Sequence, residues 1–256
     1  MKNEEPQKKA QGHQDHRKNF TDLSAYITKK LTLVSLSQGL VMEYSDNDAR
    51  QKLIEFGQWL DQHKLCPATS GNLSARLSSD QFLVTVSGRH KGYLKSADFV
   101  PIQLDHQTPL HLQKNLVVLE DQKPSAETWV HSVLYRLNPK LRFILHTHSP
   151  YSTVLSRKTS KDVLEFEGYE MQKALTGIAT HEGSVSIPIF KNTQDMHALA
   201  LQIEALWQTQ AIQWGLLVQG HGLYAWGESE AEVRRHIEGL EFLMHCQILE
   251  KSMGMS

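Results

Sequence analysis

The chain has 256 residues, of which 40% are hydrophobic and 21% are charged, a balance typical of a soluble globular protein. Lys and Arg number 27 and Asp and Glu 28, so the net charge of −1 argues against nucleic acid or an anionic membrane as a partner. No apolar run approaches the roughly 20 residues of a membrane helix. The opening residues lack the apolar segment of a secretory signal, and two cysteines exclude a disulfide framework, so we expect a cytoplasmic protein.

Residues 1–45 are predicted to be a polar N-terminal extension, and residues 46–256 the folded domain. Residues 1–20 hold almost no large apolar side chains, so they cannot offset their ordering entropy, and we expect the extension to be partly disordered. Residues 21–42 are moderately apolar and fit either an added helix or a linker.

The folded domain should open with a helix that Ser45 or Asp46 caps and that ends before Pro67. Short apolar runs between turn residues predict strands at 72–77, 82–87, 99–104 and 116–119. Ser125 precedes the next predicted helix, at 126–137.

An apolar run at 143–145 predicts a buried strand that leads into His146. Further helices are expected at 151–156, 169–175, 196–209 and 229–253, and further strands at 185–190, 214–218 and 223–226. Because strands and helices intermix without a regular βαβ period, we predict an α/β fold with three layers, α/β/α, around a mixed or antiparallel sheet. The sequence has no G-x-G-x-x-G, P-loop or G-x-S-x-G motif, which argues against dinucleotide binding, nucleotide hydrolysis and α/β-hydrolase chemistry.

Histidines, of which there are 14, supply the strongest chemical signal. His146 and His148 follow the predicted buried strand, and residues i and i+2 of an extended chain point to the same side. His221 follows another predicted strand, and a glycine on each side lets its backbone approach closely. Three imidazoles with an open position are a common zinc site. An isolated H-x-H also fits two exposed strand histidines, but the histidine at a second strand end favours the metal site.

Two glutamates, Glu127 and Glu170, lie near the starts of predicted helices. A carboxylate beside a metal is a natural general acid or base. Each glutamate also fits a helix N-terminal carboxylate that the helix dipole stabilises. Sequence spacing does not choose between the two residues.

Two hydroxyl-rich turns beside predicted strands, at residues 69–72 and 87–92, can bind phosphate through their backbone N–H groups. Ordinary β-turns explain either one alone, but together with a metal site they suggest a small phosphorylated substrate. Arg89 and Lys91 could add positive charge, and a helix N-terminus after Ser125 would favour an anion. The candidate substrate-binding residues are Thr69, Gly71, Asn72, Ser87, Gly88, Arg89, Lys91 and Ser125.

Five segments, taken in chain order, resemble the class II aldolase/adducin family over roughly residues 47–250. They are A-T-S-G-N-L-S, V-S-G-R-H-K-G, P-S-A-E-T, H-T-H-S and G-H-G-L-Y-A-W-G. Two more, G-Y-E-M-Q-K-A-L and I-P-I-F-K-N-T-Q-D, are more similar to the family's dehydratases of methionine salvage than to its sugar-phosphate aldolases.

The resemblance implies a central, mainly antiparallel sheet, a homotetramer, and one zinc ion per subunit on His146, His148 and His221. It implies that Glu127 is the base of the aldolases and that Glu170 is the catalytic acid or base of the dehydratases. The phosphate loops of the family correspond to Thr69, Gly71, Asn72, Ser87, Gly88 and Ser125. Aldolases often carry a second serine where this chain has Ala126, so Arg89 or Lys91 would have to compensate.

The expected activity is therefore that of a hydro-lyase, a zinc-dependent loss of water from a small phosphorylated ketose. One alternative is a class II sugar-phosphate aldolase or epimerase, which would use the same metal and favour Glu127 as its base. Another is a non-catalytic adducin-like scaffold. Such a scaffold has no need of metal ligands, whereas all three candidate histidines are present here.

Overall fold

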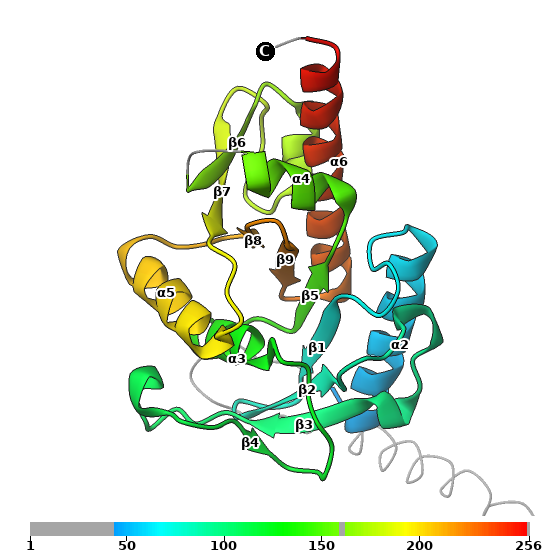
Figure 1. The fold of residues 1–256 in the computed structure, drawn as a ribbon, viewed down its shortest axis with the longest axis vertical. Coiled ribbons are helices and arrows are strands. Elements are labelled where there is room, and N and C mark those ends of the chain that lie inside the picture. Colours follow the sequence, from blue (N-terminus) through cyan, green and yellow to red (C-terminus); the bar gives the residue numbers. More distant parts are fainter. Residues whose placement is uncertain (1–43, 159–161, 255–256) are drawn as a thin grey trace, which may run out of the picture. The chain divides into compact units, whose positions relative to one another are not determined.

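One mainly antiparallel sheet organises the molecule (Figure 1). The computed structural model describes residues 44–158 and 162–254, and the predictions for residues 1–43 lie outside them. Within the described residues the strand order is β4-β3-β2-β1-β5-β9-β8-β7-β6, and only the β7–β8 pair is parallel. The strands are β1 (Asn72–Arg76), β2 (Gln81–Thr85), β3 (Phe99–Gln103), β4 (Val117–Val118), β5 (Phe143–Thr147), β6 (Val163–Glu167), β7 (Ser184–Phe190), β8 (Gly215–Val218) and β9 (Gly222–Gly227).

Helices cover both faces of this sheet, which confirms the predicted three layers. The helices α2 (Asp46–Gln62), α4 (Pro150–Lys158) and α6 (Glu230–Ser252) bury one apolar cluster against it, and α3 (Thr128–Leu137) and α5 (Met196–Thr209) bury another. The helices α3 and α5 also pack against each other (Figure 1). The short 3₁₀ helices are η1 (Lys91–Tyr93), η2 (Ser96–Asp98), η3 (Leu110–Leu112) and η4 (Glu170–Ala174).

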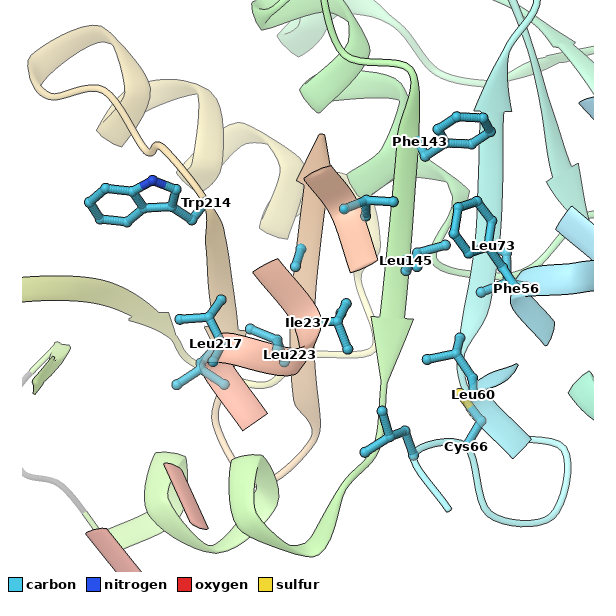
Figure 2. Packing of buried hydrophobic residues seen from close by; sticks show 14 of the residues in the cluster. Phe56, Leu60, Cys66, Leu73, Phe143, Leu145, Trp214, Leu217, Leu223 and Ile237 are labelled. Atoms are coloured by element: carbon cyan, nitrogen blue, oxygen red, sulfur yellow. The ribbon is translucent and has the colours of Figure 1, made fainter. Parts of the chain in front are cut away.

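The first three residues of strand β5 are all apolar because both faces of the strand are covered. Phe143 and Leu145 enter the cluster beneath α2 and α6, whereas Ile144 enters the one beneath α3 and α5. Successive side chains of a strand point to opposite faces, so a strand covered on both faces is apolar without alternation. Figure 2 shows Phe143 and Leu145 packed beside Phe56 of α2. Burial of each such side chain stabilises the fold by about 1.5–3 kcal/mol.

The helix ends test the capping predictions. Ser45 accepts a hydrogen bond from the Asp48 N–H at the start of α2, and Ser229 accepts one from the Glu232 N–H at the start of α6, so both predicted caps are confirmed. The predicted start at residue 126 is wrong by two residues, because α3 begins at Thr128 with Glu127 at its N-cap position. Ser125 instead accepts a bond from the Glu127 N–H, at 3.4 Å, in the turn before the helix.

Strand β6 has no counterpart among the predicted elements. Its sequence V-L-E-F-E alternates apolar and charged side chains, and the structure buries Leu164 and Phe166 while Glu165 and Glu167 face outward. This is the period-2 pattern of a strand with one wet face. No helix of the described residues is both long enough and apolar enough to cross a membrane.

Candidate metal centre

Three strand ends meet at one edge of the sheet, and this is why residues distant in sequence form a cluster. Strand β5 ends where its antiparallel neighbours β1 and β9 begin, so His146 pairs in register with Asn72 on one side and with Tyr224 on the other. The turn between β8 and β9 carries His221 to the same edge. The side chain of His146 lies on the α3 side of the sheet, where its ring stacks on that of Tyr224 at 3.8 Å.

The three predicted imidazoles converge through their Nε2 atoms. The Nε2 atom of His146 lies 2.9 Å from that of His148 and 3.3 Å from that of His221. One ligand atom from each of these histidines and from Glu127 lies within 4.8 Å of all the others, so the four residues could hold one metal ion. The Glu127 carboxylate contacts His221 Nε2 at 2.9 Å and His146 Nε2 at 3.7 Å.

The protonation states of the residues in this group favour the binding of a cation. His146 Nδ1 lies 3.0 Å from the Leu223 carbonyl oxygen, to which it must donate, so Nε2 keeps its lone pair for a ligand. Burial lowers the pKa of His146 well below its usual value and that of His148 to about 4. Burial would raise the pKa of Glu127, but the surrounding imidazoles, His146 first, lower it to about 2. At neutral pH the imidazoles of His146 and His148 are therefore neutral and the Glu127 carboxylate is ionised, which suits the group to a divalent cation.

A close backbone approach fixes the turn that carries His221. A Cβ atom at Gly222 would overlap the carbonyl oxygen of Thr147, so only glycine fits at this position between β9 and β5. The predicted close approach beside His221 is thus present.

A hollow of about 290 Å³, called here the substrate hollow, adjoins the metal group. Glu127 and His148 line one side of it, and both predicted hydroxyl-rich turns line the rest. Of the candidate substrate-binding residues, its lining includes Thr69, Gly71, Ser87, Gly88, Lys91 and Ser125.

Two side chains of the lining bring a positive charge and a free hydroxyl to this hollow. Lys91 is only 1% exposed, and its Nζ donates to the carbonyl oxygens of Thr69 and Arg89, which ties the two turns together. Burial lowers the pKa of Lys91. The buried Ser70 hydroxyl also lines the hollow and has no hydrogen-bond partner among the described residues. Ser70 was not among the predicted residues, although its place between Thr69 and Gly71 could have indicated it.

Three predicted residues lie elsewhere. Arg89 is outside the lining of the hollow and pairs with Asp98 at 3.0 Å. Asn72 is also outside the lining of the hollow, and its side-chain amide donates to the Ser125 hydroxyl and the Glu127 carboxylate. Glu170 on η4 is outside the metal group, and its exposed carboxylate pairs with Lys173 at 2.6 Å and His181 at 3.3 Å.

One buried carboxyl beneath the metal group was missed by the sequence analysis. Glu241 of α6 accepts hydrogen bonds from the hydroxyls of Thr147, at 2.9 Å, and Ser149, at 2.5 Å. Both hydroxyls belong to the segment that carries His146 and His148. Burial raises the pKa of Glu241 to about 7. The residue lies more than 90 positions from its partners in sequence, so spacing gave no signal of this contact.

Comparisons with known proteins identify the family of the chain and agree with its fold. Residues 51–248 match the family described as "Class II Aldolase and Adducin N-terminal domain". The chain therefore belongs to the class II aldolase and adducin family. It is 48% identical over 190 residues to the methylthioribulose-1-phosphate dehydratase of Yersinia enterocolitica, a match that covers 74% of this chain and 86% of the relative. It is 44% identical to the protein of the same name from Serratia proteamaculans, over 80% of this chain and 96% of the relative.

Solved structures share the fold at lower identity. The L-fuculose-1-phosphate aldolase of Thermus thermophilus superposes with a TM-score of 0.62 at 22% identity, over 83% of this chain and all of that one. A putative aldolase/epimerase/decarboxylase from Klebsiella pneumoniae gives 0.65 at 21% identity, over 81% of this chain and 91% of that one. These likenesses support the three-layer class II aldolase fold.

Proposed function

We propose that this protein is a metal-dependent hydro-lyase that removes water from 5-methylthioribulose 1-phosphate and forms 5-methylthio-2,3-dioxopentyl phosphate in methionine salvage. One observation carries the proposal: a group that could hold a metal ion adjoins a hollow lined by two hydroxyl-rich turns and Lys91, so one small phosphorylated sugar could reach both. The relatives named for this dehydratase span most of the chain at 43–48% identity, which supports the choice of substrate.

The metal we propose is zinc, held by His146, His148 and His221, because neutral imidazoles suit this ion. When bound there, zinc would supply Lewis acidity toward the substrate's oxygen atoms and so make the hydrogen at C3 more acidic. The remaining requirements fall to the protein's own side chains.

Phosphate recognition is assigned to the two turns of the substrate hollow. The turn residues Gly71 and Gly88 have positive φ angles of 75° each, a conformation in which backbone N–H groups can face a bound anion. The Ser70 hydroxyl and the Lys91 ammonium would add a donor and a charge. A phosphate fixed in the hollow would orient C3 and C4 of the sugar toward Glu127.

Proton transfer is assigned to two carboxylates. Glu127 adjoins the metal group and is ionised at neutral pH, so it would accept the proton from C3. Glu170, once protonated within the site, would donate its proton to the hydroxyl that leaves C4 as water. Because Glu170 is exposed and outside the metal group of its own chain, it would act on the site of a neighbouring copy in a homo-oligomer.

The substrate assay is the direct test. Purified protein with measured zinc content should convert methylthioribulose 1-phosphate into a product lighter by one water. L-fuculose 1-phosphate and L-rhamnulose 1-phosphate should not be cleaved. Cleavage of either sugar, without dehydration, would identify a class II aldolase instead. A native preparation without metal and without any turnover would favour an adducin-like scaffold.

Glu170 is tested by complementation between subunits. Replacement of Glu170 by Gln should lower kcat by about 10²–10⁴-fold, as for loss of a general acid, and leave zinc bound. When E170Q and H148A subunits are co-produced and mixed oligomers are isolated through two different tags, activity should return. Full activity of E170Q alone would remove Glu170 from the mechanism, and inactive mixed oligomers would contradict its action across subunits.

A homotetramer in the cytoplasm is also part of the proposal. Both cysteines of the chain are unpaired, which suits a reducing compartment. Sedimentation of the zinc-loaded protein would measure the number of subunits, and a stable monomer would contradict the shared site.

A further inference from the structure

A row of buried polar side chains runs from helix α3 into the metal group. Tyr135, Ser74, His131 and Asn72 are each at most 1% exposed, and the row ends at Glu127. The Ser74 hydroxyl lies 2.9 Å from the Tyr135 hydroxyl and 2.6 Å from His131 Nδ1. His131 Nε2 contacts the Asn72 side-chain oxygen, and the Asn72 amide nitrogen contacts Glu127.

The direction of every hydrogen bond near Glu127 follows from one fact: an ionised carboxylate only accepts. Asn72 must therefore turn its NH₂ group toward Glu127, which leaves its carbonyl oxygen facing His131. That oxygen also only accepts, so His131 must carry its proton on Nε2. Nδ1 is then an acceptor, and the Ser74 hydroxyl donates a hydrogen bond to it.

A neutral imidazole is the form that completes this row. Burial lowers the pKa of His131 to about 3, so its ring is neutral at neutral pH and has one donor and one acceptor nitrogen. A buried amide that turned over would point its oxygen at the Glu127 carboxylate and its NH₂ group at the His131 proton. Both contacts would be repulsive, so the Glu127 carboxylate on one side and the His131 N–H group on the other hold the amide in one orientation.

The orientation of the Asn72 amide affects both the metal group and the substrate hollow. The same amide nitrogen that contacts Glu127 donates to the Ser125 hydroxyl at 3.1 Å, and Ser125 lines the substrate hollow. One amide thus connects the carboxylate of the metal group to the wall of the hollow. It can do so only while the ring behind it holds the amide in one orientation.

We propose that His131 is a positioning residue, which through Asn72 holds Glu127 in place beside the metal and Ser125 in place beside the substrate. This inference deepens the proposed function and rests on it for the role of Glu127 in turnover. It gives His131, which lies in the first turn of α3 and four residues after Glu127, a part in the site.

The test compares two polar replacements of similar size. Gln at position 131 is long enough to place an N–H group near the former Nε2 atom, whereas Asn is shorter by one carbon and is not. We expect H131N to bind zinc about 10–100-fold more weakly and to lose a similar factor in kcat with little change in KM, as for loss of an outer partner of a metal ligand. H131Q should recover a large part of both losses.

His236 provides the matched control. It is also buried, at 2% exposure, and both its ring nitrogens have partners, but it lies beside Trp226 near the other end of β9. H236N should lose stability and keep its zinc affinity. Equal zinc affinities and equal kcat for H131N, H131Q and the unaltered protein would overturn the inference, as would losses in H236N that equal those in H131N.

A measurement on the unaltered protein covers the case in which the variants do not fold. The ¹⁵N chemical shifts of the His131 ring should show a protonated Nε2 and a bare Nδ1, and the opposite tautomer would overturn the inference. Zinc affinity needs no substrate. Absence of dehydratase activity would therefore refute the proposed function, whereas an unchanged zinc affinity in H131N, with the substrate still converted, would refute only the role of His131.

Discussion

The two ends of strand β9 border hollows of similar volume and opposite chemistry. At the Gly222 end lies the substrate hollow of about 290 Å³, beside the metal group. At the Gly227 end lies a second hollow of about 270 Å³, called here the tryptophan hollow, which Trp207, Trp214 and Trp226 line.

The difference lies in their hydrogen bonds. In the tryptophan hollow, Trp214 Nε1 donates to the Thr176 carbonyl oxygen and Trp226 Nε1 to that of Gln213, each within 3 Å. At the metal end, Ser70 Oγ, which lines the substrate hollow, is buried without a partner among the described residues. Buried polar groups without partners cost free energy, so they mark where a ligand is expected. Similar volumes thus do not make similar sites.

The largest expected effect comes from removing a metal ligand. H148A should bind zinc at least about 100-fold more weakly and lose nearly all turnover, because the donor set loses one of its three imidazoles. H236A, at the tryptophan hollow, should keep turnover while its free energy of unfolding falls by about 1–3 kcal/mol through lost hydrogen bonds. Zinc titration, kinetics and chemical denaturation check both variants. A loss of turnover in H236A equal to that in H148A would contradict the functional difference between the two hollows.

The Glu127 carboxylate should serve both function and stability. E127Q should lower kcat by about 10²–10⁴-fold, the usual contribution of a general base. The pKa of Glu127 is lowered in the folded state, so folding favours the ionised carboxylate, and E127Q should also lower the free energy of unfolding of the metal-free protein at neutral pH. Denaturation of metal-free protein in urea checks this. Unchanged stability in E127Q would contradict the lowered pKa, and unchanged kcat would remove Glu127 from the mechanism.

The two ends should also respond to pH with opposite sign. Glu241 has a pKa raised from 4.5 to about 7, so the folded state binds more protons between these values, and stability falls as pH rises through them, by about 3 kcal/mol in all. His236 has a pKa lowered by burial, so its contribution to stability falls as pH drops below about 6.5.

Chemical denaturation of metal-free protein across this pH range checks both groups. Relative to the unaltered protein, E241Q should gain stability as pH rises from about 4.5 to about 7, and H236N should gain it as pH falls below about 6.5. Identical pH profiles for E241Q and the unaltered protein would contradict the assignment for Glu241.

The smallest effect is expected at the rim of the tryptophan hollow. Trp207 is partly buried and its ring lies 6.0 Å from that of Trp226. W207F should keep zinc affinity and kinetic constants and should lose at most about 1–3 kcal/mol of stability, because an aromatic ring remains. Altered kcat or KM in W207F would show that the tryptophan hollow communicates with the active site.

Sequence patterns predicted the structural features that depend on residues close together in the chain. The H-x-H spacing and the glycine-flanked His221 follow from short-range geometry, and the structure brings these residues together as predicted. The three layers and most strands were also predictable, because apolar runs and turn residues are local signals.

What the sequence could not indicate depends on distant contacts. Glu241 contacts the metal segment from a helix that starts more than 80 residues later, and His131 acts through Asn72, which is 59 positions away. Glu170 carried a helix-start signal equal to that of Glu127, yet only Glu127 joins the metal group, because α3 begins at the metal edge of the sheet and η4 does not.

The tight fit at Gly222 has a consequence for how metal is acquired. Because Gly222 has no side chain, the backbone of β9 packs directly against the Thr147 carbonyl oxygen, and His146 is fixed by its hydrogen bond to the Leu223 carbonyl oxygen. Neither arrangement needs an ion. The protein should therefore fold before it is loaded, unlike a zinc finger, and should bind zinc with little rearrangement. Chelators should therefore abolish the activity of the enzyme reversibly, and added metal should restore the activity without refolding.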